Sequence, residues 1–595
     1  MVAERDFVGA SVHDAAKLQI ADGALVQLLH LHARTHELSA ALERSQPWSR
    51  RISAAVRQAR GSRPRRRAHR AFWRALRDRG SVPAGRADLT ALRELSEAGR
   101  HDEAIAFAAA LLPAKAGDGE FLDLARKAFA RAGALSLQLR ATTALRQLDG
   151  TNTRVLQERR VIGRIRETEP GWLPAVPSGH PLPAPVRGRV VHLVKATMPH
   201  RQSGYTMRGR YLVDSQRAAG LDPVVITAPD FTWPGRDGAG YATESINGTP
   251  YHHLARPPRS VLHGPVDGYL DAYAAALAER VAELAPSVLH VHSGHRGYEA
   301  ALVGLAVARS FGLPLVYEVR GFFESLWSQE SPWNERGELY ARRLETELRC
   351  MRAADAVVTL STSMQAEIVG RGVAREKVHV VPNGVDVSAF TPGPPPPGLA
   401  GDLALDGRLV FGYVSNLDHR REGHETLIRA AAVLRSRGLS AVALIVGDGD
   451  RRAELERLAE HENAADAVVF TGRVPHDEVL AYYRLLDVFV VPRAAERAAR
   501  LVTPLKPFEA MAAGVPLVVS ALDPLLEIIG DGERGRSFPP GDATALADVL
   551  EALHHAPDTR SELAKRGRDW VAAERRWSVN ADRYAEIYRS VLNTR

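Results

Sequence analysis

A lysine and a glutamate stand three residues apart at the start of a predicted helix, in Thr503-Pro-Leu-Lys-Pro-Phe-Glu509. Thr503 is the residue type of an N-cap and Pro504 that of a first helical position. Lys506 and Glu509 then share one face of the first two turns. Free amides, the helix dipole and the ammonium would form a site for a phosphate or diphosphate, and Glu509 would accept bonds from sugar hydroxyls. The alternative is an ordinary capped helix with a surface lysine and glutamate.

Two further patterns contain residue types that bind metals. His290 and His292 alternate along one predicted strand and therefore point the same way, as zinc ligands, catalytic groups or hydrogen-bonded core residues do. No third ligand is indicated. Asp448-Gly-Asp450 contains two carboxylates, but its position between a strand and a helix, beside Gly447 and Gly449, favours a tight turn. We predict no metal site.

Other residues have the chemistry to hold a departing phosphate. Gly204 falls in a turn after the first predicted strand, where a missing side chain lets amides approach a phosphate, or where the glycine serves only the turn. Arg420 and Arg421 follow the strand that ends at Ser415 and are candidate cations. Negative charge that develops on a leaving phosphate is stabilised by such amides and cations.

Composition indicates a globular protein of several domains. A chain of 595 residues, 45% hydrophobic and 25% charged, has the length of three or four domains. The single cysteine, Cys350, excludes an internal disulfide and favours a reducing compartment. The start has no signal-peptide pattern, and no run approaches the ~18 apolar residues that span a bilayer. We expect a cytoplasmic protein, or one peripheral to the inner face of the membrane.

The net charge of +8 is concentrated in one segment. Residues 50–79 contain twelve arginines and one acid, a charge of +11, so the rest of the chain carries 8 − 11 = −3. Three interpretations of this segment are open. The composition favours a solvated arginine-rich helix, and the second interpretation is a segment docked on an anionic membrane. A nucleic-acid site is the least favoured.

Helical periodicity dominates the first part of the chain. Apolar residues recur at three and four from residue 11 to about 165, and 89–112 and 121–148 form weak repeats, offset by 34 residues, that resemble tetratricopeptide hairpins. Residues 170–186 hold six prolines and predict a linker. We expect a helical module that could recruit a protein partner or the membrane.

Short apolar strands then alternate with amphipathic helices. The predicted strands are 189–195, 224–227, 288–292, 315–319 and 356–360, followed after a proline-rich break by 409–415, 442–446, 468–470, 488–491 and 516–519. This alternation predicts two tandem Rossmann-like doubly wound α/β domains, with a binding crevice between their strand ends. The expected boundaries are a helical module at 1–170, a linker at 171–187, α/β domains at 188–391 and 401–577 joined by 392–400, and a last helix at 578–595 that crosses back to the first α/β domain.

Several separated motifs resemble one enzyme family. They are Ser203-Gly-Tyr-Thr-Met-Arg208, Tyr317-Glu-Val-Arg-Gly-Phe-Phe-Glu324, Asn383-Gly-Val-Asp386, Gly447-Asp-Gly449, Gly472-Arg-Val-Pro475 and Thr503-Pro-Leu-Lys-Pro-Phe-Glu-Ala-Met-Ala-Ala-Gly-Val-Pro516. In this order, over residues 188–592, they are similar to the retaining GT-B glycosyltransferases of family 4, in a subgroup linked to polysaccharide synthesis. The resemblance implies transfer of a hexose from a UDP- or GDP-sugar, without metal or cofactor, to a glycan, lipid-linked or small-molecule acceptor.

The resemblance also implies roles for particular residues. Arg473 and Val474 would frame the nucleobase, Glu509 would hold the ribose, Lys506 with Gly204 would hold the diphosphate, and His292 would lie on the acceptor side. The remaining positions expected beside the donor are Tyr205, Asn416, Arg421 and Gly449.

The chain departs from the family pattern at several positions. Arg320 stands where the family often has a catalytic-region histidine; it stays protonated and cannot act as a general base, but it could bind a phosphate. Leu501 stands where the first of two paired glutamates is expected, and Glu496 is a candidate replacement at a different spacing. Asn416 and Glu422 replace an arginine and a lysine, and Lys506 could supply the displaced positive charge.

Three classes of function are therefore compared. The leading hypothesis is a retaining hexosyltransferase with Lys506, Glu509, Arg320 and His292 as its catalytic residues. The second is a nucleotide-sugar-binding scaffold that has lost catalysis with the missing glutamate and uses the helical module for recruitment. The third is a nucleic-acid-binding protein that uses residues 50–79, which would show steep salt dependence.

Overall fold

The structure is a computed structural model that describes residues 84–178, 184–233, 240–294, 297–322 and 337–594. The basic segment 50–79 lies outside these residues. The chain forms two compact units. Among the described residues, the first contains 84–174, Pro257–Ala272 and 337–347, and the second contains the others.

The first unit is built from helices. They are α5 (Ala84–Glu97), α6 (His101–Leu111), α7 (Gly119–Ala132), α8 (Leu135–Asp149), α9 (Asn152–Glu167) and α11 (Arg259–Leu262), with parts of α12 (Val266–Leu284) and α14 (Glu338–Ala353). Leu92, Phe121 and Phe129 are fully buried in its core. The Asp118 side chain accepts from the Phe121 amide and caps α7. The carboxylate of Glu338 accepts from the amide and hydroxyl of Ser136, at 2.8 and 2.6 Å, so α14 is bonded to α8.

The second unit contains two mostly parallel sheets. The first has the strand order β3-β4-β2-β1-β5-β6-β7-β8, and only the β3–β4 pair is antiparallel. Its strands are β1 (Val186–Val194), β2 (Asp222–Thr227), β3 (Ala242–Ile246), β4 (Thr249–His253), β5 (Pro286–His292), β6 (Leu315–Glu318), β7 (Ala356–Thr359) and β8 (Val378–Val380). Its helices outside the first unit include α10 (Gly204–Ala218), α13 (Glu299–Phe311) and α15 (Thr362–Gly370).

The second sheet has the order β11-β10-β9-β12-β13-β14 and is parallel throughout. Its strands are β9 (Leu409–Val414), β10 (Ala441–Val446), β11 (Val468–Phe470), β12 (Val488–Val491), β13 (Leu517–Ser520) and β14 (Gly535–Phe538). The helices that accompany it include α16 (Leu399–Asp402), α17 (His424–Ser436), α18 (Arg452–His461), α19 (Val479–Tyr483), α20 (Arg497–Leu501), α21 (Lys506–Ala512), α22 (Asp523–Ile529), α23 (Ala543–His554) and α24 (Pro557–Glu574).

Burial explains why these segments form parallel strands. Every residue of β9, β10, β12 and β13 is buried, as expected of strands covered by helices on both faces. The two predicted doubly wound α/β domains are therefore confirmed, and the ten predicted strands correspond to β1, β2, β5, β6, β7 and β9 to β13. Strands β3, β4, β8 and β14 were not predicted.

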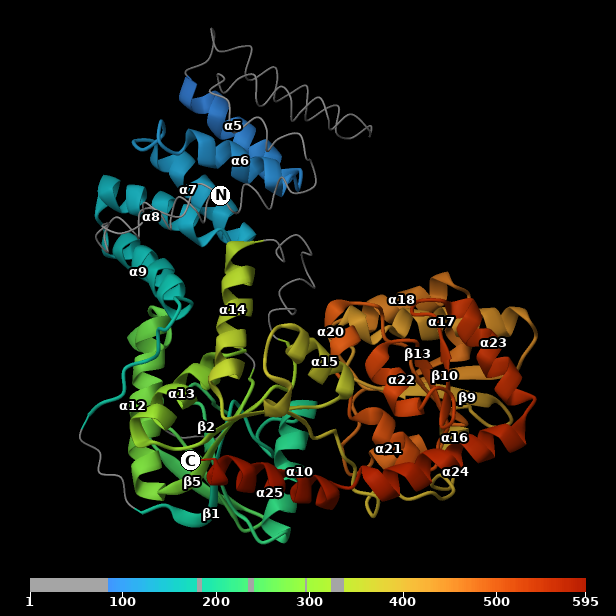
Figure 1. The fold of residues 1–595 in the computed structure, drawn as a ribbon. Helices are drawn as coiled ribbons and strands as arrows, with labels where there is room; N and C mark the ends of the chain where they lie inside the picture. The colour runs from blue at the N-terminus through green and yellow to red at the C-terminus, as the bar shows by residue number, and fades with distance from the viewer. Residues whose placement is uncertain (1–83, 179–183, 234–239, 295–296, 323–336, 595) are drawn as a thin grey trace, which may run out of the picture. The chain divides into compact units, whose positions relative to one another are not determined.

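The last helix, α25 (Trp577–Asn593), packs against α10 beside the first sheet. Figure 1 shows it in red, running from α24 toward the β5 region. Tyr584, Ile587, Tyr588 and Val591 are buried with residues of the first sheet. The chain enters this helix through a short parallel bridge, in which the Val385 amide donates to the Arg575 carbonyl at 2.8 Å. We call the domain of the first sheet the N-lobe and the domain of the second sheet the C-lobe.

Candidate functional site

Helix α21 begins two residues later than the sequence predicts. It spans Lys506–Ala512, with Leu505 as its N-cap and no side-chain bond at the cap. The Thr503 carbonyl accepts from the Asn383 side chain at 3.0 Å, and the Thr503 hydroxyl has no hydrogen-bond partner among the described residues. The assignments of Thr503 as N-cap and Pro504 as first helical residue are therefore wrong, because the Asn383 amide holds this carbonyl outside the helix.

Lys506 and Glu509 form a pair on the first turns of α21. The Lys506 ammonium lies 3.1 Å from Glu509 Oε2, and the Tyr483 hydroxyl donates to the same oxygen at 2.7 Å. The carboxylate is nearly buried, whereas the lysine side chain is 31% exposed. Tyr211 of α10 lies 3.3 Å from His476, and burial, assisted by the Glu509 charge, raises the pKa of Tyr211 to about 12. The pair therefore lies on the side of the C-lobe that faces α10.

Gly204 lies against the segment that leads into α21. It is the first residue of α10, and the Ser203 side chain caps that helix. A Cβ built on Gly204 would lie 3.5 Å from Leu505 Cδ1, and one built on Gly321 would lie 3.5 Å from Val502 Cγ2. A side chain at either position would therefore touch the C-lobe at ordinary contact distance. The start of α10 lies close to the start of α21.

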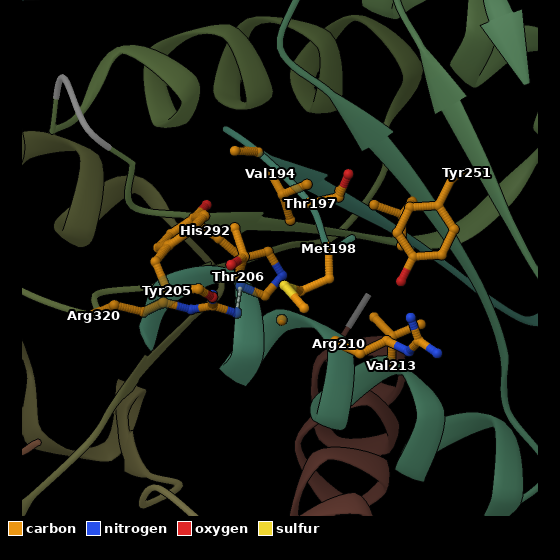
Figure 2. Close-up of a pocket in the computed structure, with 13 residues that line it drawn as sticks. Val194, Thr197, Met198, Tyr205, Thr206, Arg210, Val213, Tyr251, His292 and Arg320 are labelled. Carbon is orange, nitrogen blue, oxygen red and sulfur yellow. Dashed lines mark hydrogen bonds between the residues drawn. The ribbon is translucent and has the colours of Figure 1, made fainter. Parts of the chain in front are cut away.

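Tyr205, His292 and Arg320 line a pocket of the N-lobe (Figure 2). The Arg320 guanidinium donates to Glu318 Oε1 at 2.7 Å, to the Tyr205 carbonyl at 2.9 Å and to His292 Nδ1 at 2.7 Å. It also lies over the Tyr205 ring, 4.7 Å from the centroid. Arg320 is only 6% exposed, so its orientation is fixed by the protein.

Three buried imidazoles form a group that we call the histidine cluster: His192 of β1 with His290 and His292 of β5. One nitrogen from each lies within 4.8 Å of the others, a spacing that could hold a metal ion. The expectation that His290 and His292 have no third neighbour of this kind is therefore wrong, because β1 and β5 pair in register and place His192 opposite His290. Burial lowers the pKa of all three imidazoles.

Glu318 is the carboxylate, among the described residues, that His290, His292 and Arg320 share. Arg208 Nε donates to its Oε1 at 3.0 Å, and the Tyr584 hydroxyl donates to its Oε2. Burial raises the pKa of Glu318, but Arg208 and Arg320 outweigh it and hold that pKa well below its usual range. Sequence reasoning missed Glu318, Arg208 and His192 as site residues. The available signal was a glutamate inside a buried strand, which requires a cationic partner.

The loops after β9, β10 and β11 meet at the carboxyl edge of the second sheet. Gly447 has a φ of 143°, and a Cβ built there would lie 1.8 Å from the Ser415 carbonyl oxygen. A Cβ on Gly449 would lie 2.4 Å from Asp418 Oδ1, and the Gly447 amide donates to the Gly472 carbonyl at 3.1 Å. Only glycines allow this packing of three loops.

The remaining residues expected beside the donor lie around this edge. Asn416 is exposed and its side-chain oxygen accepts from the Asp418 amide at 2.7 Å, within its own turn. Asp448 likewise accepts from the amide of Gly449, as expected of a strand-to-helix turn. Arg473 is exposed, while Val474 packs against the C-lobe core.

Arg421 is one of the arginines of the C-lobe, with Arg451, that the described residues leave incompletely hydrogen-bonded. Its Nε lies 3.3 Å from Glu422 Oε1, but its Nη1 is buried and has no hydrogen-bond partner among the described residues. Burial lowers the pKa of Arg421. Glu422 is also held by Arg493, at 3.2 Å. Arg420 instead reaches Glu454 at 2.7 Å and is largely exposed, so Arg421 is the better placed of the two candidate cations.

Glu496 stands close enough to Arg421 for the two charges to interact. It is the N-cap of α20, a separate helix from α21, and is half-buried. Burial raises the pKa of Glu496, and the Arg421 charge opposes that shift. An acid therefore lies near Arg421, although position 501 is a leucine.

Comparison with known proteins identifies the family. The description "Glycosyl transferases group 1" matches residues 401–570, and "Glycosyl transferase 4-like domain" matches residues 203–384. The D-inositol 3-phosphate glycosyltransferase 1 of Catenulispora acidiphila is 30% identical over 361 residues, which are 59% of this chain and 82% of the relative. The chain belongs to the group 1 glycosyl transferases. The D-inositol 3-phosphate glycosyltransferase of an Arthrobacter species is 27% identical to this glycosyl transferase over 394 residues, 63% of this chain and 89% of the relative.

The fold of this glycosyl transferase is GT-B, as the sequence predicted. The sucrose-phosphate synthase of Thermosynechococcus elongatus superposes with a TM-score of 0.56 at 23% identity, over 69% of this chain and all of that chain. Within the described part of the chain, none of the helices combines the length and apolar character needed to cross a bilayer.

Proposed function

We propose that this glycosyl transferase moves a hexose, with retention of anomeric configuration and without a metal, from a nucleotide diphosphate sugar to a glycan, lipid-linked or small-molecule acceptor. The bond between the sugar C1 and the diphosphate oxygen breaks, and a bond from C1 to an acceptor oxygen forms on the same face. The diphosphate oxygen takes the electron pair of the broken bond, and the acceptor hydroxyl gives its proton to that departing oxygen.

The single observation that carries this proposal is the buried Nη1 of Arg421, which no side chain or carbonyl of the described residues satisfies. A buried guanidinium nitrogen without a partner is costly unless a ligand satisfies it. It stands beside the loops that follow β9 and β10, at the carboxyl edge where parallel α/β sheets bind nucleotides. An anionic diphosphate would complete its hydrogen bonding and offset its charge.

Lys506 and Glu509 have complementary roles in this proposal. The ammonium already contacts Glu509, but it is partly exposed and has donors left for a second acceptor. We assign it to the leaving diphosphate, and we assign Glu509 to the ribose hydroxyls. The Tyr483 hydroxyl, which donates to Glu509, keeps the carboxylate in place.

On the acceptor side, the geometry changes the role expected of His292. Its Nδ1 faces the Arg320 guanidinium at 2.7 Å, and its Nε2 lies 3.0 Å from His192 Nδ1. Neither ring nitrogen is available to take a proton from an acceptor. We therefore assign His292 to holding Arg320, which lines the pocket.

The test uses purified full-length protein with a panel of UDP- and GDP-hexoses, and it measures nucleotide release and the anomer formed by NMR. Arg421→Ala and Lys506→Ala should each remove about 2–4 kcal/mol of transition-state stabilisation, roughly a 30- to 1000-fold loss in kcat/KM. Lys565→Ala is the matched control, because that lysine is 77% exposed and pairs only with the surface residue Asp569 among the described residues.

Three outcomes would change the proposal. Unchanged kcat/KM in both variants would remove the assigned roles of Lys506 and Arg421. Donor binding without hydrolysis or transfer across the panel would favour a nucleotide-sugar-binding scaffold. Loss of activity with EDTA, restored by a divalent cation, would show that metal independence is wrong.

A further inference from the structure

The histidine cluster belongs to a path of hydrogen bonds in the N-lobe, which a 3.4 Å contact between His290 Nε2 and Glu318 Oε2 closes. The path begins at Arg320, passes through the three imidazoles and α25, and returns to Arg320 through Glu318. Its members, in order, are Arg320, His292, His192, Gln216, Tyr588, His290 and Glu318. All of them are buried.

The proton positions along this path follow from the chemistry of Arg320. A guanidinium can only donate, so His292 Nδ1, 2.7 Å from Arg320 Nη2, must accept. A neutral imidazole that accepts at Nδ1 carries its proton on Nε2. That nitrogen lies 3.0 Å from His192 Nδ1, which therefore accepts in turn.

The same reasoning continues around the path. His192 Nε2 donates to Gln216 Oε1 at 2.9 Å, and the Gln216 amide nitrogen donates to the Tyr588 hydroxyl at 2.8 Å. The hydroxyl then has its own proton for His290 Nδ1, at 2.7 Å. His290 therefore carries its proton on Nε2, which lies 3.4 Å from Glu318 Oε2 and has no hydrogen-bond partner among the described residues. The hydrogen bonds have one consistent direction from Arg320 to His290, and the last contact reaches Glu318, whose other oxygen accepts from Arg320.

We propose that this path is a positioning network, in which all three imidazoles are neutral with the proton on Nε2 and the orientation of Arg320 depends on the seating of α25. This proposal rests on the proposed function in one respect: it treats the pocket beside Arg320 as part of the active site. Gln216 and Tyr588 are thereby positioning residues, because they act on the pocket through His292 and Arg320.

Charge supports the neutral state of the imidazoles. Glu318 is one carboxylate between the guanidiniums of Arg208 and Arg320, so these three groups already carry a net positive charge in a buried site. A protonated imidazole would add a further positive charge there. Burial lowers the pKa of each imidazole, and the Arg320 charge adds to that shift.

The network also separates two interpretations of the histidine cluster. Its spacing could accommodate a metal ion, yet the Nδ1 atoms face Arg320, His292 and Tyr588, and the Nε2 atoms face His192, Gln216 and Glu318. A metal would have to displace these partners and would bring another positive charge beside two arginines. Hydrogen bonding is therefore the favoured use of the cluster.

Helix α25 supplies two hydroxyls to this region. Tyr588 connects Gln216 to His290, while Tyr584 accepts from Arg208 at 3.0 Å and donates to Glu318. Helix α25 follows the C-lobe in the chain and packs on α10 of the N-lobe. In this proposal, the position of α25 therefore affects the orientation of Arg320 through the hydrogen bonds of Tyr588 and Tyr584.

The first experiment reads the tautomers directly from protein labelled with 15N-histidine. At pH 7.5 the 15N chemical shifts of His192, His290 and His292 should all be those of neutral rings protonated at Nε2. Each signal is assigned by a single substitution. One ring protonated at Nδ1, one imidazolium, or a shift of the cluster on adding Zn²⁺ would overturn the network.

The second experiment tests the connection to α25 with Tyr588→Phe. This variant keeps the ring but removes the hydroxyl, so the signals of His290, His192 and His292 should all shift, and kcat/KM for transfer should fall about tenfold while donor affinity is unchanged. Val591→Ala, on the same buried face of α25, is the control that loses packing and leaves the three signals unchanged. A Tyr588→Phe spectrum that differs at His290 alone would overturn the positioning role.

The two proposals fail in different ways. If the wild-type tautomers agree with the network but no donor is turned over, the proposed function fails and the network stands. If transfer is observed with a different set of tautomers, the enzyme assignment stands and the network fails.

Discussion

Replacing Glu318 by glutamine should strongly destabilise this glycosyl transferase. The carboxylate is fully buried and lies 3.0 Å from Arg208 Nε and 2.7 Å from Arg320 Nε. Glutamine has nearly the same shape, so the substitution removes the charge while leaving the packing almost unchanged. Two buried guanidiniums would then lack their counter-ion.

The magnitude follows from what remains after the substitution. Removing one partner of a buried ion pair costs about 3–5 kcal/mol, because the uncompensated charge stays in a medium that solvates it poorly. Glutamine still offers one acceptor oxygen, so part of the hydrogen bonding of Arg208 or Arg320 survives. We therefore expect a loss of about 3–5 kcal/mol in the free energy of unfolding.

The assay is urea unfolding of the purified protein, followed by circular dichroism and by tryptophan fluorescence. The matched control is Glu367→Gln, because that carboxylate also contacts two arginines, Arg371 and Arg497, but is 32% exposed. A pair exposed to this degree contributes about 0–1 kcal/mol. The reasoning is refuted if Glu318→Gln costs no more than Glu367→Gln.

Three further predictions concern pH, a glycine turn and a helix cap. The imidazoles of the histidine cluster have lowered pKa values in the folded state, so as the pH falls the unfolded chain takes up protons before the folded protein does. The free energy of unfolding should therefore be at its full value above about pH 6.5 and decrease below it by up to about 1.4 kcal/mol per pH unit per imidazole. A urea midpoint that stays constant between pH 7.5 and 5.5 would contradict this. Gly447→Ala should cost about 3 kcal/mol of stability and weaken nucleotide-sugar binding, because the added Cβ would meet the Ser415 carbonyl. The control is Gly438→Ala, at a φ of 79° with open space around it, which should cost only about 1–2 kcal/mol of stability in thermal melts. Asp118→Ala should cost about 1 kcal/mol and accelerate amide exchange at the start of α7, since the Phe121 amide loses its acceptor; unchanged exchange would argue against the cap.

Local patterns in the sequence were sufficient to predict most strands of both sheets. Continuous apolar runs such as Val442–Val446 are fully buried in β10, and such runs are typical of parallel strands covered on both faces. The strands that escaped prediction have weaker signals. Strand β3 alternates between half-buried and exposed residues, and β14 contains a glycine, one half-buried residue and one exposed residue.

Motifs located the two sides of the site but could not describe their contacts. Lys506 and Glu509 were predicted on one face of a helix, and the structure pairs them at 3.1 Å. The start of that helix was placed wrongly, because the Asn383 side chain, 120 residues away in the chain, holds the Thr503 carbonyl. A cap motif is a local signal, and here a distant amide overrides it.

The sequence by itself determined which segments form buried strands, in what order they alternate with helices, and that the chain has the motifs of a glycosyl transferase, because these depend on residue type and local spacing. Only the tertiary structure decided how the buried charges are satisfied. His192, Glu318 and Tyr588 come from two strands and the last helix, and the proton positions of the imidazoles follow from contacts across up to 372 residues of chain. Hydrogen bonds and ion pairs act over a few ångströms in space, so no local pattern in the chain could have specified them.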